Sequence, residues 1–186
     1  MQAQDPDAHE VNGQALHSVE AKTALLNQCS AQQVSAESVV ATTSAIATAQ
    51  ANDFAAETSA IGLVQADQAE TRMSLVGAAV GEEVSTDLTL SGLVVAGDHA
   101  RVEQSVAQVV VVGANADVTQ SVSGVTLVGA SARLANTYSL ILVAGGDIHA
   151  EGEVHTVLDP ASARSFGLAF GAVFGLFWLL RALLKR

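Results

Sequence analysis

Several kinds of residue are scarce in this chain, and each scarcity excludes a class of protein. A single cysteine, Cys29, excludes an internal disulfide, so the fold is not held by disulfide bonds. Two prolines and an aromatic content of 4% leave a hydrophobic fraction, 49% of the residues, that consists mainly of alanine and valine. Eight Lys and Arg residues against 19 Asp and Glu give a net charge of −11. Such a chain repels phosphate backbones, so we expect no nucleic acid partner.

A repeat of about 16 residues dominates the second half of the chain. Blocks that begin at residues 88, 104, 120 and 136 superpose without a gap. Three block positions are apolar throughout and hold Leu90, Val106, Val122 and Tyr138, then Leu93, Val109, Val125 and Ile141, then Val95, Val111, Leu127 and Val143. A fourth position is a column of glycines, namely Gly81, Gly97, Gly113, Gly129 and Gly145. Equal spacing of this kind is typical of a solenoid.

The glycine column predicts one corner of a stacked coil, because glycine accepts positive φ without steric cost. β-Branched runs such as Val109–Val112 favour strands between the corners. Helical solenoids need repeats of about 33 residues or more, and so do not fit. The sequence therefore predicts an all-β, single-stranded β-solenoid with coils of about 16 residues. About seven or eight coils at roughly 4.8 Å each would make a rod about 35 Å long.

The repeat weakens toward the N-terminus. Residues 40–55 and 56–71 keep it in part, with Ile61, Leu63 and Val64 in register, and before residue 40 the phase is uncertain. We assign residues 24–158 to the solenoid and 1–23 to a polar N-terminal arm or cap. The weakening fits an atypical capping repeat. A Ser/Thr/Gln-rich end that contacts a partner is the alternative.

A hydrophobic segment ends the chain. After a linker at residues 159–164, residues 165–180 contain no charge, which at 1.5 Å per residue covers about 24 Å as a helix. Extension to Leu184 gives about 30 Å, the thickness of a bilayer core. Residues 165–186 are therefore predicted to form a transmembrane anchor helix. Gly167, Gly171 and Gly175 form a strip on one face that would let another helix approach closely.

The predicted orientation in the membrane balances two arguments. The membrane-interface residues are Arg164, Trp178, Arg181, Lys185 and Arg186, and the cations beyond the helix would place the C-terminus in the cytoplasm. Residues 1–10, however, have neither the basic nor the apolar region of a secretory signal. Since the acidic domain would need such a signal to cross, we expect a single-pass protein of the cell membrane with a cytoplasmic solenoid and the lipid bilayer as partner.

No reactive site is evident in the sequence. The five histidines, His9, His17, His99, His149 and His155, share no position of the repeat, which argues against a zinc site. Glu82, Glu83, Asp98, Asp117 and Asp147 lie beside the glycine corners and are interpreted as solvated charges. The hexapeptide pattern of acyltransferase β-helices occurs once per coil only, and the period is shorter than the three hexapeptides that such a coil contains. We predict no catalytic residue, no metal, no cofactor and no enzymatic activity.

The short, valine- and glycine-rich coils of residues 40–158, together with a simple membrane attachment, resemble the bactofilins, which are polymer-forming bacterial cytoskeletal proteins. The resemblance implies a non-catalytic scaffold that assembles without nucleotide at the inner face of a membrane, as a homo-oligomer or polymer.

Two other functions remain open. The first is an accessory subunit of a larger membrane complex, in which the glycine strip packs on a different membrane protein. The second is a surface adhesin or ice-binding rod, suggested by the hydroxyl-bearing coils around Thr42, Thr43, Thr58 and Ser59.

Overall fold

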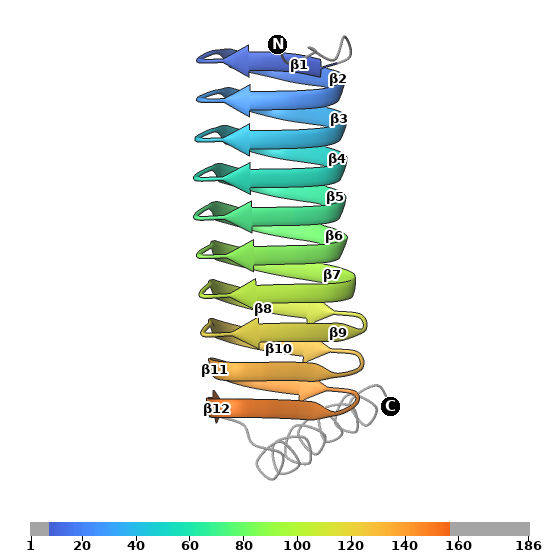
Figure 1. The fold of residues 1–186 in the computed structure, drawn as a ribbon, viewed down its shortest axis with the longest axis vertical. Coiled ribbons are helices and arrows are strands. Elements are labelled where there is room, and N and C mark those ends of the chain that lie inside the picture. Colours follow the sequence, from blue (N-terminus) through green and yellow to red (C-terminus); the bar gives the residue numbers. More distant parts are fainter. Residues whose placement is uncertain (1–7, 157–186) are drawn as a thin grey trace, which may run out of the picture.

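The computed structural model describes residues 8–156, which form one 12-stranded parallel sheet wound into a β-solenoid of about ten turns (Figure 1). The strands are β1 (Ala8–Asn12), β2 (Ala15–Asn27), β3 (Ser30–Thr42), β4 (Ala45–Glu57), β5 (Ala60–Arg72), β6 (Leu75–Asp87), β7 (Leu90–Glu103), β8 (Val106–Val112), β9 (Asn115–Thr119), β10 (Val122–Val128), β11 (Ala132–Ala144) and β12 (Ile148–Thr156). The predicted all-β solenoid is confirmed. Its number of turns exceeds the seven or eight that we expected.

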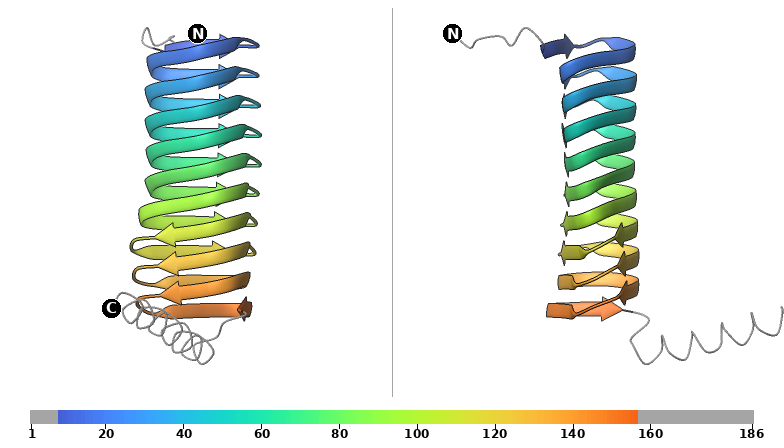
Figure 2. Two further views of the ribbon diagram at one scale, coloured as in Figure 1. Left: turned by 180° about the vertical axis from the view of Figure 1, so that it is seen from behind. Right: turned by 90° about the vertical axis from the view of Figure 1, so that its right-hand side faces the viewer.

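Each coil is flat and has two faces. Strands β2 to β7 run along one face, bend smoothly, return along the other face and end at a tight turn (Figure 2). Lower in the rod the bend breaks the strand, so that β8 and β9 form the two halves of one coil. We call the half that follows the tight turn, such as residues 60–65 or β8, the first face. The returning half, such as residues 68–72 or β9, is the second face.

The coil lengthens by one residue along the rod. Ala15 lies opposite Ser30 and Ser30 opposite Ala45, a spacing of fifteen positions, whereas Leu90 lies opposite Val106 and Val106 opposite Val122, a spacing of sixteen. The extra residue enters in the bend of β7, because Gly81 lies opposite Ala96 but Glu83 lies opposite His99. The weakening of the repeat toward the N-terminus was therefore a change of period, and a period of sixteen throughout was wrong.

The solenoid also begins earlier than the sequence suggested. Residues 8–23, which we assigned to a polar arm or cap, form β1 and most of β2, and β1 pairs with the end of β2. Residues 1–7 and 157–186 lie outside the described part, so the linker at 159–164 and the anchor helix at 165–186 do too.

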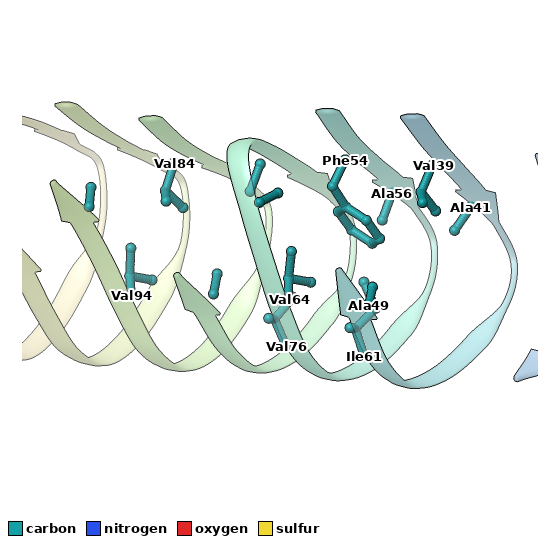
Figure 3. Packing of buried hydrophobic residues seen from close by; sticks show 14 of the residues in the cluster. Val39, Ala41, Ala49, Phe54, Ala56, Ile61, Val64, Val76, Val84 and Val94 are labelled. Carbon is teal, nitrogen blue, oxygen red and sulfur yellow. The ribbon is translucent and has the colours of Figure 1, made fainter. Parts of the chain in front are cut away.

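A thin core of small side chains fills the space between the two faces (Figure 3). Val64, Val94 and Val110 are fully buried on the first face, and Ala100, Ala116 and Ala132 occupy one column of the second. Phe54, 2% exposed, fits because its neighbours in the adjacent coils are Val39 and Ala69. The scarcity of aromatic residues follows from this thinness, since two sheets so close together have room for few large rings.

The apolar columns that revealed the repeat do not form this core. Leu90, Val106 and Val122 are 52%, 46% and 48% exposed. Buried columns lie between them, and one of these, which consists of Ser91, Ala107, Ser123 and Ser139, is more polar. Ser123 lies 2.8 Å from the Thr126 hydroxyl and donates to Ser139 at 3.0 Å, which satisfies these two serines, whereas the Ser91 hydroxyl has no partner within residues 8–156.

The tight turn is built on a left-handed residue followed by a buried one. Eight non-glycine residues have φ between 46° and 54°, namely Gln28, Thr43, Thr58, Met73, Leu88, Gln104, Gln120 and Asn136. The buried residue that follows is Cys29, Ser44, Ser59, Ser74, Thr89, Ser105, Ser121 or Thr137. The Ser59 hydroxyl accepts from the Ser44 N–H at 3.2 Å and donates to the Glu57 carbonyl at 2.9 Å. Repeated along most of the rod, these bonds make a ladder that joins each corner to the next.

Candidate functional site

The first face of the lower coils carries no charge. Its segments, residues 75–80, 90–95, 106–112, 122–128 and 138–144, contain no Asp, Glu, Lys, Arg or His. They follow one another in register on β6, β7, β8, β10 and β11. The result is a continuous apolar surface on one side of the rod.

This surface consists of a ridge beside a groove. The ridge is the column Leu75, Leu90, Val106, Val122 and Tyr138, whose exposed fractions range from 46% to 55%. Two residues further along the same strands, a shallow groove follows Gly62, Gly77, Gly92 and Gln108. Glycine is required there because a Cβ on Gly92 would lie 2.6 Å from the Gly77 carbonyl oxygen. The groove therefore exists because the coils stack closely along this column.

The second face, in contrast, is charged. It carries acids in most coils, among them Asp53, Glu70, Glu83, Asp117 and Glu151. Three exposed ion pairs moderate this charge: Arg72 with Glu70 at 3.3 Å, Arg101 with Glu103 at 2.7 Å and Arg133 with Glu151 at 2.8 Å. The hydrogen bond to Glu103 raises the pKa of the Arg101 guanidinium. Exposed pairs of this kind contribute little stability, so they mainly set the surface potential.

The histidines are spread along the rod. His17 is in β2, His99 in β7, and His149 and His155 in β12; His9 lies in β1. His155 approaches Glu153 at 3.8 Å, and its ring centroid lies 5.6 Å from that of Tyr138. No group of three or more His, Cys, Asp or Glu side chains in residues 8–156 could hold a metal ion.

The predicted corner glycines stack in one column at the bend, but their backbone differs from the expectation. None of Gly81, Gly97, Gly113, Gly129 and Gly145 has positive φ, and the left-handed residues lie at the opposite, tight turn. Their role is close approach: a Cβ on Gly113 would meet the Gly97 carbonyl, and one on Gly129 the Gly113 carbonyl. Glu82, Asp98 and Asp147 lie next to this bend.

The threonines that suggested an ice-binding array belong mainly to the tight turn. Thr43 and Thr58 are left-handed corner residues, and Ser59 is 4% exposed. The Ser59 hydroxyl is bonded to the backbone, and the exposed corner column of Thr43 and Thr58 continues with Gln28 on one side and Met73 on the other. These residues therefore do not form a regular array of threonines.

The remaining predicted site residues fall outside the described part. These are the strip Gly167, Gly171 and Gly175 and the interface residues Arg164, Trp178, Arg181, Lys185 and Arg186. Within residues 8–156 the chain forms no helix that could cross a bilayer.

Sequence reasoning missed the first face as a surface, although two signals for it were present. One is the run of charge-free segments that recur once per coil. The other is the second glycine column, Gly62, Gly77, Gly92 and Gly124. Both are recognised easily only once the change of period is known.

Both ends of the described rod present strand edges. At the N-terminal end β1 covers only residues 23–27 of β2, and at the other end β12 pairs with β11 alone. Each end is thus a step of about half a coil. Parallel edges that have no partner strand within residues 8–156 are templates for further strands.

Fold and surfaces together define a β-solenoid of about ten turns with one acidic and one partly apolar face. No protein family, no curated protein and no solved structure matches the chain.

Proposed function

We propose that this chain is a non-catalytic structural scaffold, a rod that assembles head to tail through the ends of its solenoid. The observation that carries the proposal is the half-coil step at each end of residues 8–156. On the first face β11 has an edge beyond Ser139, the last residue that pairs with β12, and β2 has an edge before residue 23. On the second face the outermost strands are β12 and β1.

In a head-to-tail contact β12 of one copy would pair with β1 of the next on the second face, which continues the parallel sheet from copy to copy along that face. Because the two surfaces differ, the contact is heterologous and does not close, and it generates an open filament. This assembly requires no nucleotide. It is the behaviour that the resemblance to bactofilins implies.

The proposal also includes attachment to a membrane through residues 165–186, with the acidic solenoid on the cytoplasmic side. The charge-free residues 165–180, long enough as a helix to cross most of a bilayer core, support the attachment. The Gly167, Gly171 and Gly175 strip would then supply a second contact between copies, within the bilayer.

Electron microscopy of the full-length protein in mild detergent, beside a chain that ends at Asp159, tests the assembly. We expect filaments from both proteins, because the edges lie in residues 8–156. Discrete particles from the full-length protein that become monomers on truncation would contradict head-to-tail assembly and favour a helix-mediated oligomer.

A further inference from the structure

We propose that the uncharged first face of β6, β7, β8, β10 and β11 binds a second copy of this chain. The ridge of each copy would lie in the glycine groove of the other. This lateral contact is separate from the head-to-tail contact proposed above and uses different residues.

The shape of the face supports a second copy as the partner. Ridge and groove run side by side from β6 to β8, two residues apart on the same strands, so this part of the surface carries both a protrusion and the hollow to receive it. Gly124 continues the groove column on β10, and the exposed Leu140 ends it on β11. A two-fold contact needs a self-complementary surface of this kind. Leu90 of one copy would then lie over Gly92 of the other, where no side chain blocks the approach of two sheets.

The charge distribution also favours contact through the first face. The second face carries Asp53, Glu70, Glu83, Asp117 and Glu151, so two copies repel each other through that side. On the first face of the lower coils, which is both uncharged and apolar, two acidic rods can meet without opposing like charges. An anionic bilayer is a poorer partner, because no Lys or Arg lies on this face to attract its head groups.

The geometry also fixes the direction of pairing. The ridge of one copy lies over the groove of the other only if the two-fold axis is parallel to the rods and passes between the ridge and groove columns. A two-fold axis perpendicular to the rods and parallel to the face would place the two ridges on each other. The paired rods are therefore parallel, with each coil opposite its counterpart. Both chains then leave the described solenoid, at Thr156, from the same end, which lets both C-terminal segments reach one membrane.

The area of the face predicts a weak dimer. Five coils at about 4.8 Å and six residues at about 3.3 Å give a footprint of about 500 Å² on each copy. The total of about 1,000 Å² lies below the roughly 1,200 Å² of standard stable interfaces. We therefore expect association that depends on concentration and is strengthened when a membrane confines the copies.

Site-directed cross-linking of the full-length protein in phosphatidylcholine vesicles tests the proposal. Cys29→Ser, which matches the serines of its own column, provides a cysteine-free background. Gln108→Cys places a thiol in the groove, and Asn115→Cys places an exposed thiol on the second face of the same coil as a matched control. The reagent is a bismaleimide that spans about 10 Å, the distance between packed sheets.

We expect a covalent dimer from Gln108→Cys and at least about five-fold less from Asn115→Cys. In the Gln108→Cys protein, the double substitution Leu90→Glu and Val122→Glu should reduce the yield of cross-linked dimer at least five-fold. The reason is that dimerisation would then bury carboxylates of like charge against each other. Gln68→Glu with Asn115→Asp adds the same charge to the second face and should leave the dimer largely intact. Leu90 and Val122 are about half exposed, so unchanged circular dichroism and melting should show that the charged variant folds.

Equal cross-linking at both thiols, or none in the Gln108→Cys protein, would overturn the proposal. A groove thiol shielded from maleimide in a monomer would instead place the chain's own C-terminal segment on the face. Quenching of a fluorophore on the groove thiol by nitroxide lipids would place the bilayer there. Both results overturn the proposal. Filaments of the Leu90→Glu, Val122→Glu variant would still form by head-to-tail assembly, so the two proposals fail independently.

Discussion

In the hydroxyl ladder at the tight turn, the stability of each corner depends on the hydrogen bonds of a single buried side chain. Ser59 accepts one bond from the backbone of the preceding corner and donates another within its own turn, at 3.2 and 2.9 Å. Its side chain is 4% exposed, so water does not replace these partners. Substitution therefore leaves buried backbone groups without hydrogen bonds, which costs more than an ordinary surface change.

Ser59→Ala should lower the free energy of unfolding by about 1–2 kcal/mol, because the Ser44 N–H loses its acceptor. Thr48→Ala removes an exposed hydroxyl of the first face and serves as the control. Urea denaturation of both variants measures the difference. Equal stability of the two would show that the ladder does not stabilise the rod.

Thr86 shows the opposite case, a buried hydroxyl without a partner. Its side chain is fully buried and makes no hydrogen bond within residues 8–156. Thr86→Val should raise the free energy of unfolding by about 1 kcal/mol, since the unpaired hydroxyl is replaced by a methyl group of similar size. Thr126→Val, which removes a hydroxyl bonded to Ser123 at 2.8 Å, should lower stability. Destabilisation by both substitutions would contradict this account.

The glycine column at the bend offers a test of why glycine is needed there, either for close approach of neighbouring coils or for backbone conformation. Gly129→Ala should destabilise the fold by about 1–3 kcal/mol, because the added Cβ would overlap the Gly113 carbonyl of the preceding coil. Gly97→Ala is the matched control in the same column, where the nearest heavy atoms would lie 3.8 Å from the Cβ. Thermal unfolding of the two variants distinguishes them. A similar loss from both would point to backbone conformation as the reason for glycine.

At the scale of the strand, the unit of this protein is one coil. Each coil pairs only with the coil before and the coil after it, so the rod is nearly one-dimensional in its energetics. Residues fifteen positions apart in the earlier coils, and sixteen apart in the later ones, occupy the same place in successive coils. The additional residue of the longer coils lies in the bend. The long strands β2 to β7 keep the bend continuous, whereas the later coils break it beside a glycine.

Deletion of residues 45–59, one complete coil, should yield a folded and shorter solenoid, because Ala60 then takes the place of Ala45 after Ser44. We expect unchanged far-UV circular dichroism per residue and a melting temperature lower by about 2–5 °C. Deletion of residues 45–52 exchanges the two faces and should abolish folding. Failure of the whole-coil deletion to fold would show that coils are not interchangeable.

At the scale of the whole molecule, charge opposes assembly and the apolar face favours it. The net charge of −11 makes every approach between copies unfavourable at low ionic strength. In 0.1 M salt the repulsion between charges more than about 10 Å apart is largely screened. The burial of Leu75, Leu90 and Val122 at a contact does not depend on such screening.

Self-association of the full-length protein should therefore strengthen several-fold between about 20 and 300 mM NaCl, as measured by analytical ultracentrifugation in detergent. The effect should be the same in KCl, because screening does not depend on the identity of the cation. Association that weakens with salt would mean that ion pairs, and not the apolar face, hold the copies together.

The class of fold was predictable from the sequence because a solenoid repeats its residues at a fixed spacing. The column of five glycines and the β-branched runs led directly to stacked β-coils. The N-terminal coils escaped this reasoning, since a period of fifteen drifts by one residue per coil against a period of sixteen. With period-two side-chain alternation, one residue of drift exchanges inward and outward positions.

By itself the sequence determined that this chain stacks small β-coils into an acidic rod, because spacing and charge are properties of the linear chain. Only the tertiary structure decided which columns face the core. Leu90, Val106 and Val122 are more apolar than Ser91, Ala107 and Ser123, yet the first set is exposed and the second is buried. The reason is physical: the two close sheets leave little space along this column, so it takes small side chains, and the larger apolar residues of the neighbouring column lie outside. There they form the surface that we propose a second copy covers.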